Sequence, residues 1–339
     1  MTQHAAFDVS LKVAHGCIVD ASGQVLKEGK VAAEPETMAA WLNRHAPELA
    51  RVGIETGPLA TWHLHALRKL GVPVVCLDAR HAHKVLSCWP IKTDKNDARG
   101  LAELVRLGAF RQVAVRSEAS VRRRALLGAR EQLVRMRRDV ENQIRGLLRS
   151  FGRLLGSARG RAFAGRAKEL VADEPLLAAI IEPLLRVRER LVDEVAALEG
   201  KLVAEARTDP VCRRLATVPG VGPITALAFQ SGVDDVTRFE DRRQVGAWLG
   251  LVPRRHRSGK MDYSGKISKA GDGRVRALLF EAAHVLLSRV KRGCALKDWA
   301  EQLARRVGMR KAKVAVARKL AVLLARLWAK EEVFRWQAA

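Results

Sequence analysis

Apolar and polar positions in the first third of the chain alternate in a way that predicts a mixed sheet. Residues 6–20 have the pattern of two strands, and Ala21–Gln24 has the composition of a turn into a third strand. Helical spacing and short apolar runs then take turns, which predicts helices over 36–45 and 59–70 and strands over 52–55 and 72–77. Strands that alternate with helices in this way predict an α/β sheet with helices on its faces.

The middle third has the spacing of long helices. From about residue 117 to residue 207 the chain is rich in Arg, Leu and Glu, and a second apolar run covers 184–203. The first run places five apolar residues in heptad-like register, namely Leu126, Leu133, Val140, Ile144 and Leu147. Glycines in the stretch 151–165 predict the connection between two helices. We therefore expect a long spacer built as an antiparallel or an intermolecular coiled coil.

The last third predicts a helical domain. Residues 217–228 contain a short apolar entry, a turn at Gly220-Val221-Gly222 and a helix, which is the pattern of a helix-hairpin-helix. The glycines Gly220 and Gly222 would let backbone N–H groups meet a phosphate, although a plain turn between two core helices has the same pattern. Further helices are predicted over 239–251, 274–288 and 311–328. The expected fold class is α/β plus all-α.

Charge divides the chain into an almost neutral front and a basic remainder. Residues 1–110 hold 13 Lys and Arg against 11 Asp and Glu, whereas the remaining residues hold 48 against 25, so nearly all of the net charge of +25 follows residue 110. A strongly basic region binds polyanions, of which nucleic acid is the most common. With one Tyr and eight Phe in the chain, phosphate contact rather than base stacking is the expected mode of binding.

Membrane, disulfide and zinc proteins are disfavoured. No apolar run approaches the ~20 residues that cross a bilayer, and the chain starts without a signal-peptide pattern, so we expect no membrane partner and a cytoplasmic, nucleoid-associated protein. The five cysteines form no Cys-x-x-Cys pair and are expected to be buried or idle thiols. The pairs His63-x-His65 and His81-x-His83 have no third ligand nearby and are assigned no role.

Four carboxylates are placed for metal chemistry. Glu55 falls at the carboxyl end of a predicted strand, and Asp8 lies in the first strand, where it can point to the same side. Asp94 and Asp97 have the spacing that puts two side chains on one face of a helical turn. Any one of them alone is most simply a solvated or helix-capping carboxylate. Together they predict a site that holds Mg²⁺ against a phosphodiester.

A basic loop at 253–260 offers a nucleophile. The hydroxyl of Ser258 could attack a phosphate there, since neighbouring cations would stabilise the developing charge and Gly259 would permit close approach. From residue chemistry alone, Ser264 and Ser268 compete with it on equal terms. The cations that we expect to contact phosphates are Arg254, Arg255, Arg257, Lys260, Lys266 and Lys269.

These residues belong to short blocks that follow one another in a recognisable order. The blocks are Asp8–Ser10, Gly53–Leu59, Cys76–His81, Lys92–Arg99, Val218–Pro223, and Ser258-Gly259 followed by Gly265–Lys269. Over nearly the whole chain, this ordered set resembles the transposases of the insertion sequence 110 family. Several blocks in one order are far more specific than any single motif.

The resemblance implies three domains. These are a RuvC-like (RNase H-like) domain over 1–115 with an Asp-Glu-Asp-Asp metal site, a coiled-coil spacer over 116–208, and a C-terminal transposase domain over 209–339. The four acids of the family map to Asp8, Glu55, Asp94 and Asp97. The family's nucleophilic serine precedes a glycine after a Gly-Leu-x-Pro segment, here Gly250–Pro253, and so maps to Ser258. Ser264 and Ser268 become secondary candidates.

For function, the resemblance implies a site-specific recombinase. Ser258 would form a covalent phosphoserine link to double-stranded DNA, while Mg²⁺ on the acidic cluster orients the phosphate. The implied partners are the element ends and target DNA, a guide non-coding RNA, and further copies of the chain, in a dimer or tetramer whose subunits complete the sites together. Many relatives have Gly where this chain has Phe7, and Ser and Gly where it has Arg257 and Lys260; neither change removes a reacting group.

Two other functions are open from the residues. One is a RuvC-type, metal-dependent endonuclease that cuts DNA with water and uses Ser258 only to hold a phosphate. The other is a non-enzymatic, basic DNA-binding protein in which the acids only cap helices.

Overall fold

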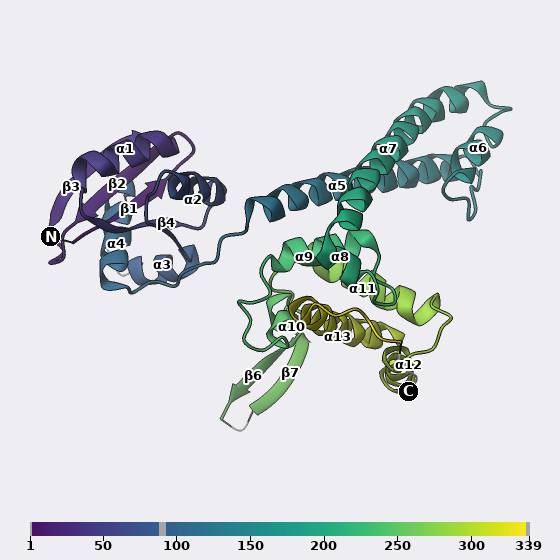
Figure 1. Ribbon diagram of the computed structural model, residues 1–339. Helices are drawn as coiled ribbons and strands as arrows, with labels where there is room; N and C mark the ends of the chain where they lie inside the picture. The colour runs from purple at the N-terminus through teal and green to yellow at the C-terminus, as the bar shows by residue number, and fades with distance from the viewer. Residues whose placement is uncertain (1, 88–92, 260, 337–339) are drawn as a thin grey trace. The chain divides into compact units, whose positions relative to one another are not determined.

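The protein divides into two compact units in a computed structural model, which describes residues 2–87, 93–259 and 261–336. The units are Met1–Glu118, purple to blue in Figure 1, and Ala119–Ala339, blue to yellow. Across the described residues, no helix has both the length and the apolar character that crossing a bilayer requires.

The first unit is a five-stranded mixed sheet with flanking helices. Its strands are β1 (Gln3–Val9), β2 (Val13–Val19), β3 (Val25–Ala32), β4 (Leu49–Glu55) and β5 (Val74–Leu77). Its helices are α1 (Pro35–His45), α2 (Ala60–Lys69), α3 (Ala79–Leu86) and α4 (Asp94–Leu107). The strand order is β3-β2-β1-β4-β5, in which β1 to β3 are antiparallel neighbours while β4 and β5 run parallel to β1. The predicted α/β sheet is confirmed, and its form is consistent with a RuvC-like domain.

Side-chain alternation gives the sheet two apolar faces. Phe7 on β1 and Ile54 on β4 belong to the core shared with α1 and α2, whereas Ala6 on β1 belongs to the core shared with α4. On the α4 side, β4 carries Gly53, where a Cβ atom would lie only 2.5 Å from Cγ2 of Val105. The missing side chain lets α4 pack closely over the centre of the sheet.

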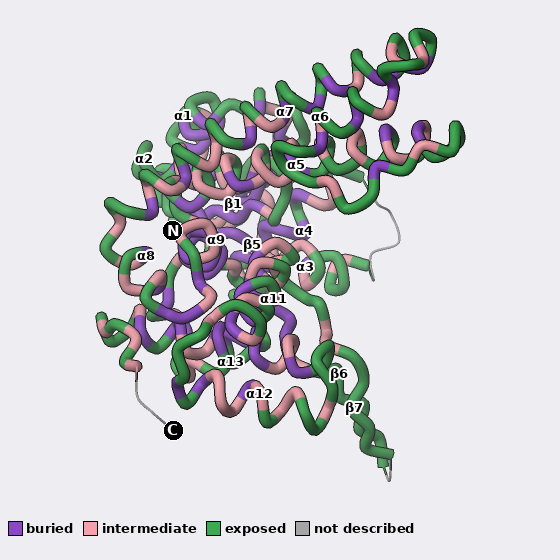
Figure 2. Tube along the Cα trace, turned by 90° about the vertical axis from the view of Figure 1, so that its right-hand side faces the viewer, coloured by how far each residue is buried: buried purple, intermediate pink, exposed green. Residues whose placement is uncertain are grey.

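The second unit is helical apart from one hairpin. Its helices are α5 (Glu118–Ser150), α6 (Ala162–Glu169), α7 (Pro175–Thr208), α8 (Pro210–Leu215), α9 (Pro223–Val233), α10 (Gln244–Trp248), α11 (Gly273–Ser288), α12 (Ala295–Val307) and α13 (Met309–Lys330). The hairpin consists of β6 (Pro253–Ser258) and β7 (Met261–Ile267). Buried residues of α9, α11 and α13 form the main core of this unit, and Figure 2 shows the two strands of the hairpin as mostly exposed.

The expected helix over 239–251 is wrong in extent, because only α10 within it is helical. The side chain of Asp241 accepts a hydrogen bond from the backbone N–H of Arg243, and the guanidinium of Arg242 donates to the carbonyl oxygens of Val236 and Phe239. Local side-chain bonds of this kind compete with the helical ladder. The chain therefore turns before it enters α10.

Helices α5 and α7 run antiparallel, as their ion pairs establish. The partners rise in number along α5 while they fall along α7: Arg123 with Glu205, Arg130 with Glu199, and Glu141 with Arg188. The Nε–Oε1 distances of these pairs are 2.6, 2.8 and 3.0 Å. Long polar side chains thus connect α5 with α7 in this part of the helical hairpin.

The buried stripe of α5 is offset from the expected heptad. Leu127 and Val134 are buried where Leu126 and Leu133 were expected, and these two are only half-buried. Ile144 is buried as expected, in a cluster with α6 and α7. A straight α-helix has 3.6 residues per turn, so its buried stripe drifts relative to a strict seven-residue repeat. A coiled coil in the strict sense is not established by this packing.

Candidate active site

Two of the four predicted acids lie on neighbouring strands and on one face of the sheet. In the parallel pairing of β1 with β4, Ala6 lies opposite Gly53, on the face that carries α4. Asp8 and Glu55 each follow two residues later, so alternation puts both side chains on that same face at the carboxyl ends of their strands. Parallel strands deliver their carboxyl ends to one edge, where open α/β sheets place ligand sites.

Asp8 and Glu55 line one cavity of about 320 Å³. Its remaining wall is formed mainly by Thr56–Ala60, which connects β4 to α2. Both acids are half-buried, so their carboxylates are confined while the cavity still admits a ligand. The backbone N–H of Thr56 donates to the carbonyl oxygen of Leu77 at 2.9 Å, which holds the start of this connection against β5.

The other two acids lie in the first turn of α4. Thr93 is the N-cap of this helix, and its hydroxyl oxygen accepts a hydrogen bond from the backbone N–H of Asn96 at 3.2 Å. Negative side chains are stabilised at a helix N-terminus by the peptide dipoles. Asp94 is exposed and Asp97 is half-buried, and their helix covers the sheet face that carries Asp8 and Glu55.

His15 on β2 connects the two groups of acids and was missed by the sequence prediction. It lies directly opposite Asp8 in the β1–β2 register, and its Nδ1 atom is 3.6 Å from Oδ2 of Asp94. The only signal in the sequence was the hairpin itself, in which the turn after Val9 fixes which residue of β2 faces Asp8. A histidine can act as a hydrogen-bond partner or as a metal ligand, so this position belongs to the candidate site.

Asp94 lines a second cavity of about 490 Å³ together with His15, Glu28 and Lys95. The Nζ atom of Lys95 lies 2.9 Å from Oε2 of Glu28, so this acid already forms an ion pair within the protein. Asp8 and Glu55 thus line one cavity, whereas Asp94 lines a different one. In the part of the chain that the structure describes, no three His, Cys, Asp or Glu side chains form a group able to hold a metal ion.

Carboxylate chemistry nevertheless suits Mg²⁺ at this face. Mg²⁺ prefers oxygen ligands and is usually held by one or two carboxylates, water and substrate phosphates rather than by a complete protein cage. The pair of Asp8 and Glu55 matches that requirement, and Asp94 and Asp97 are two further carboxylates on the helix that packs on the same face.

Ser258 lies at the tip of the β6–β7 hairpin, in a strand rather than in the expected loop. It is the last residue of β6, is paired with Met261 and is exposed. Gly259 follows with a φ of +53°, a conformation that glycine adopts without steric cost and that suits a tight hairpin turn. The tip therefore presents the Ser258 hydroxyl to solvent.

The two other serines differ in position. Ser264 lies in the middle of β7 opposite Arg255, and Ser268 lies at the root of the hairpin. The backbone N–H of Ser268 donates to the carbonyl oxygen of Val252 at 2.8 Å, and its hydroxyl oxygen accepts from Ala270 N at 3.4 Å. Of the three, Ser258 alone stands at the turn.

The hairpin carries several of the predicted phosphate contacts. Arg255 is paired with Asp262, at 2.8 Å between Nε and Oδ1, and a hydrogen bond from this guanidinium lowers the pKa of Asp262. Arg254 donates to the carbonyl oxygen of Ser268 at 3.2 Å. Arg257 and Lys266 form no ion pair with another described residue, so their charges are available to a ligand.

Lys269 and Lys260 are the other two cations among the predicted phosphate contacts. Lys269 has a φ of +55°, and its backbone N–H donates to the carbonyl oxygen of Gly250 at 3.1 Å. Lys260 lies outside the described residues.

The two glycines of the predicted helix-hairpin-helix have different surroundings. Gly220, with a φ of +85°, packs against α11, where a Cβ atom would lie 2.4 Å from the carbonyl oxygen of Ala282. Gly222 is exposed and is the N-cap of α9, which has no side-chain cap. Helix packing therefore accounts for Gly220, and Gly222 is the one placed to approach a phosphate through backbone N–H groups.

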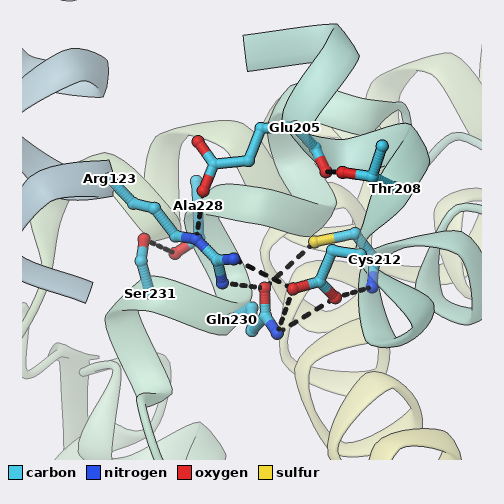
Figure 3. A network of polar contacts seen from close by, with 8 residues as sticks. Arg123, Glu205, Thr208, Cys212, Ala228, Gln230 and Ser231 are labelled. Atoms are coloured by element: carbon cyan, nitrogen blue, oxygen red, sulfur yellow. Dashed lines mark hydrogen bonds and ion pairs between the residues drawn. The ribbon is translucent and has the colours of Figure 1, made fainter. Parts of the chain in front are cut away.

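A polar network joins the start of α5 to α7, α8 and α9 (Figure 3). The guanidinium of Arg123 donates to Glu205, to Asp209 at 3.0 Å and to Oε1 of Gln230 at 2.7 Å. Cys212 Sγ lies 3.1 Å from the same Gln230 oxygen, and burial raises the pKa of this thiol to about 12. The four described cysteines are all buried, as predicted, and Cys88 lies outside the described residues.

The five-stranded mixed sheet, with two acids at one of its edges, is consistent with the class of RuvC-like domains. A transposase family model for DEDD proteins of IS110 elements matches residues 5–152, and a model described as the transposase IS116/IS110/IS902 family matches residues 212–299. The chain belongs to the IS110 family of insertion-sequence transposases.

Individual relatives agree with this placement. The chain is 32% identical to the transposase for insertion sequence element IS1111A of Coxiella burnetii, over 78% of this chain and 74% of the relative. It is 35% identical to a probable family 20 transposase of Pseudomonas aeruginosa, over 72% and 74%. It is 29% identical to the transposase for insertion sequence element IS1328 of Yersinia enterocolitica, over 68% and 71%.

Proposed function

We propose that the chain breaks and rejoins double-stranded DNA as the recombinase of an insertion sequence, with Ser258 as the nucleophile. The proposed ligands of Mg²⁺ are Asp8, Glu55, Asp94 and Asp97. The observation that carries the proposal is the cavity shared by Asp8 and Glu55 at adjoining strand ends, together with the two further acids in the first turn of α4, the helix that packs on the same sheet. Acids at such a position suit phosphoryl transfer.

The chemistry conserves the number of phosphoester bonds. The Ser258 oxygen forms a bond to phosphorus and its hydroxyl loses a proton, while the bond from phosphorus to a sugar oxygen breaks and that oxygen gains a proton. A sugar hydroxyl of another strand then attacks the phosphoserine and frees the Ser258 hydroxyl. Mg²⁺ held by the four acids would supply positive charge beside the phosphate, and the guanidinium of Arg257 would stabilise negative charge on the phosphate oxygens.

We extend the proposal to the architecture of the chain. The domains would be 1–115, 116–208 and 209–339, with α5 and α7 as a coiled-coil spacer that joins copies into a dimer or tetramer. The acids and Ser258 lie in different units, and so we propose that the site is completed between subunits. The exposed N-terminus of α9 at Gly222 would contact phosphate in a helix-hairpin-helix, and a non-coding RNA would guide the choice of DNA.

Replacing the nucleophile separates this proposal from hydrolysis by water. We expect Ser258→Ala to abolish both the protein–DNA adduct that survives denaturant and the exchange of strands, because the variant has no oxygen that can bond to phosphorus. The matched control is Ser264→Ala, which removes a hydroxyl from the same hairpin. If Ser258→Ala kept cutting DNA, the chain would be a RuvC-type endonuclease that uses water.

Replacing an acid tests the metal site. We expect Glu55→Gln to lower the rate of strand exchange about 100-fold or more, and higher Mg²⁺ concentrations to restore part of it, because a neutral amide binds the ion more weakly. Glu36→Gln, at an exposed position of α1, should leave the rate unchanged. Unaltered exchange in Glu55→Gln and Asp97→Asn would refute a catalytic role for these acids. They would then only cap helices or be solvated at the surface.

A further inference from the structure

A second basic site lies in the helical unit, on elements that do not include the β6–β7 hairpin. A cavity of about 430 Å³ is bounded by the start of α12, one face of α13 and the segment that follows α13. Pockets of 300–1,000 Å³ are typical of sites that hold small molecules or parts of larger ones. The volume is therefore large enough to admit part of a larger ligand.

Positive charge lines this cavity. Lys319, Arg326 and Lys330 are spaced by seven and four residues and so share one face of α13, and Arg335 projects from the following segment. Glu332 is the one carboxylate among the lining residues, so the cavity has an excess of three positive charges. None of these four cations forms an ion pair with a carboxylate in the residues that the structure describes.

The surroundings of Lys319 favour an anionic ligand. Its Nζ atom lies 3.7 Å from the centre of the Trp299 ring, and burial lowers the pKa of this ammonium group. A partly dehydrated cation without an acidic partner gains more from an anion than a fully hydrated one does. Leu323 and Leu327 form an apolar floor between the charges.

The segment that follows α13, which forms the third wall of the cavity, is held in place by hydrogen bonds. Glu331 has a φ of +57°, which ends α13 and turns the chain back, and the backbone N–H of Glu332 donates to the carbonyl oxygen of Leu327 at 3.1 Å. Further along, the backbone N–H of Phe334 donates to the hydroxyl oxygen of Thr217 at 2.9 Å. These bonds give the cavity a defined shape before any ligand arrives.

Backbone donors add to the side-chain charges. Cys294, Ala295 and Leu296 at the start of α12 line the cavity, and Cys294 is an N-cap without a side-chain cap. The first N–H groups of a helix carry partial positive charge and are suited to phosphate oxygens.

We propose that this cavity binds consecutive phosphates of a nucleic-acid strand, as a second contact site besides the hairpin. The distance along α13 from Lys319 to Lys330 is about 16 Å at 1.5 Å per residue, more than one phosphate can bridge. A polynucleotide presents phosphates in series and so meets all of these cations, whereas a free phosphate or mononucleotide meets only some. The site lets the transposase hold one segment of nucleic acid here while another lies at the hairpin.

Lysine acetylation of the full chain tests the site locally. We expect single-stranded DNA or RNA of about 20 nucleotides to protect Lys319 and Lys330 from acetylation several-fold more than Lys311, an exposed lysine near the start of the same helix. Inorganic phosphate or a mononucleotide at equal phosphate concentration should protect them weakly. Equal reactivity with and without polynucleotide, or protection by the mononucleotide alone, would overturn the proposal.

Paired substitutions give an independent measure. Arg326→Gln with Lys330→Gln should weaken polynucleotide binding about tenfold near 0.1 M salt and lower the salt dependence by about two charges. Arg310→Gln with Lys311→Gln removes the same charge from the same helix and should have little effect. Equal losses in both pairs would mean that only net charge matters. The Ser258 adduct should still form in the Arg326 and Lys330 variant at high DNA concentration, so the two proposals can fail separately.

Discussion

Asp209 combines helix capping, partial burial and ion pairing in one residue. Burial raises the pKa of its carboxyl, but hydrogen bonds from the N–H of Cys212 and the amide of Gln230, together with the charge of Arg123, outweigh this and leave the pKa lowered. A carboxyl whose pKa is lower in the folded state contributes stability above its unfolded pKa of about 4, and this contribution is lost as the pH falls through the folded value.

We therefore expect Asp209→Asn to lower the free energy of unfolding by about 1–3 kcal/mol at pH 7, since the neutral amide still caps α8 but no longer pairs with Arg123. At pH 3, which is below the unfolded pKa, the difference between variant and parent should shrink, because the carboxyl of the unfolded parent is then largely protonated. Urea unfolding at both pH values measures this, with Asp139→Asn at an exposed position of α5 as the control. An equal loss at both pH values would contradict the argument.

At the residue scale, the sequence predicted side chains whose position follows from the ends of strands. Asp8 and Glu55 lie near the carboxyl ends of two strands, so their meeting at one edge of the sheet could be predicted. His15 could not, because its place opposite Asp8 depends on the register of a hairpin. Gly53 is likewise explained only by α4, whose approach to the sheet is a tertiary contact.

At the element scale, the antiparallel pairing of α5 with α7 can be tested by exchanging charges. We expect Arg130→Glu to lower the free energy of unfolding by about 1 kcal/mol, because it places two carboxylates face to face, and Glu199→Arg to have a similar effect. The double variant should recover most of the loss. Chemical unfolding of all four proteins gives the coupling energy. Additive losses would show that these residues do not meet.

Long elements were easier to predict than short ones, for a physical reason. The helices α5 and α7 have 33 and 34 residues, so their spacing was unmistakable, although the buried stripe drifted by one position. The segment before α10 has helical composition but is held in turns by Asp241 and Arg242. The exposed hairpin β6–β7 could not be predicted from its sequence because its strands have no alternation of apolar and polar residues. Strand β6 instead carries Arg254, Arg255 and Arg257.

At the scale of the whole molecule, the charge asymmetry of the chain predicts how it binds DNA. Neutralising phosphates releases counterions, so affinity falls steeply with salt, and each lost contact lowers the slope of log K against log salt by about 0.9. Replacing Arg254, Arg257 and Lys266 with Gln should therefore reduce the slope by about three. Replacing Lys12, Lys27 and Lys84, exposed lysines of the almost neutral first unit, removes the same charge and should leave the slope nearly unchanged.

Fluorescence anisotropy of labelled duplex DNA between about 0.05 and 0.3 M salt measures both slopes. If the two triple variants behaved alike, binding would follow the net charge of +25 rather than its position, and the hairpin would have no special part in it. If only the hairpin variant changed, the cations on the two hairpin strands would be in contact with phosphates. A serine at the end of an exposed strand can reach phosphorus only when the backbone of the DNA is held along that strand, so this outcome would also tie binding to the proposed chemistry.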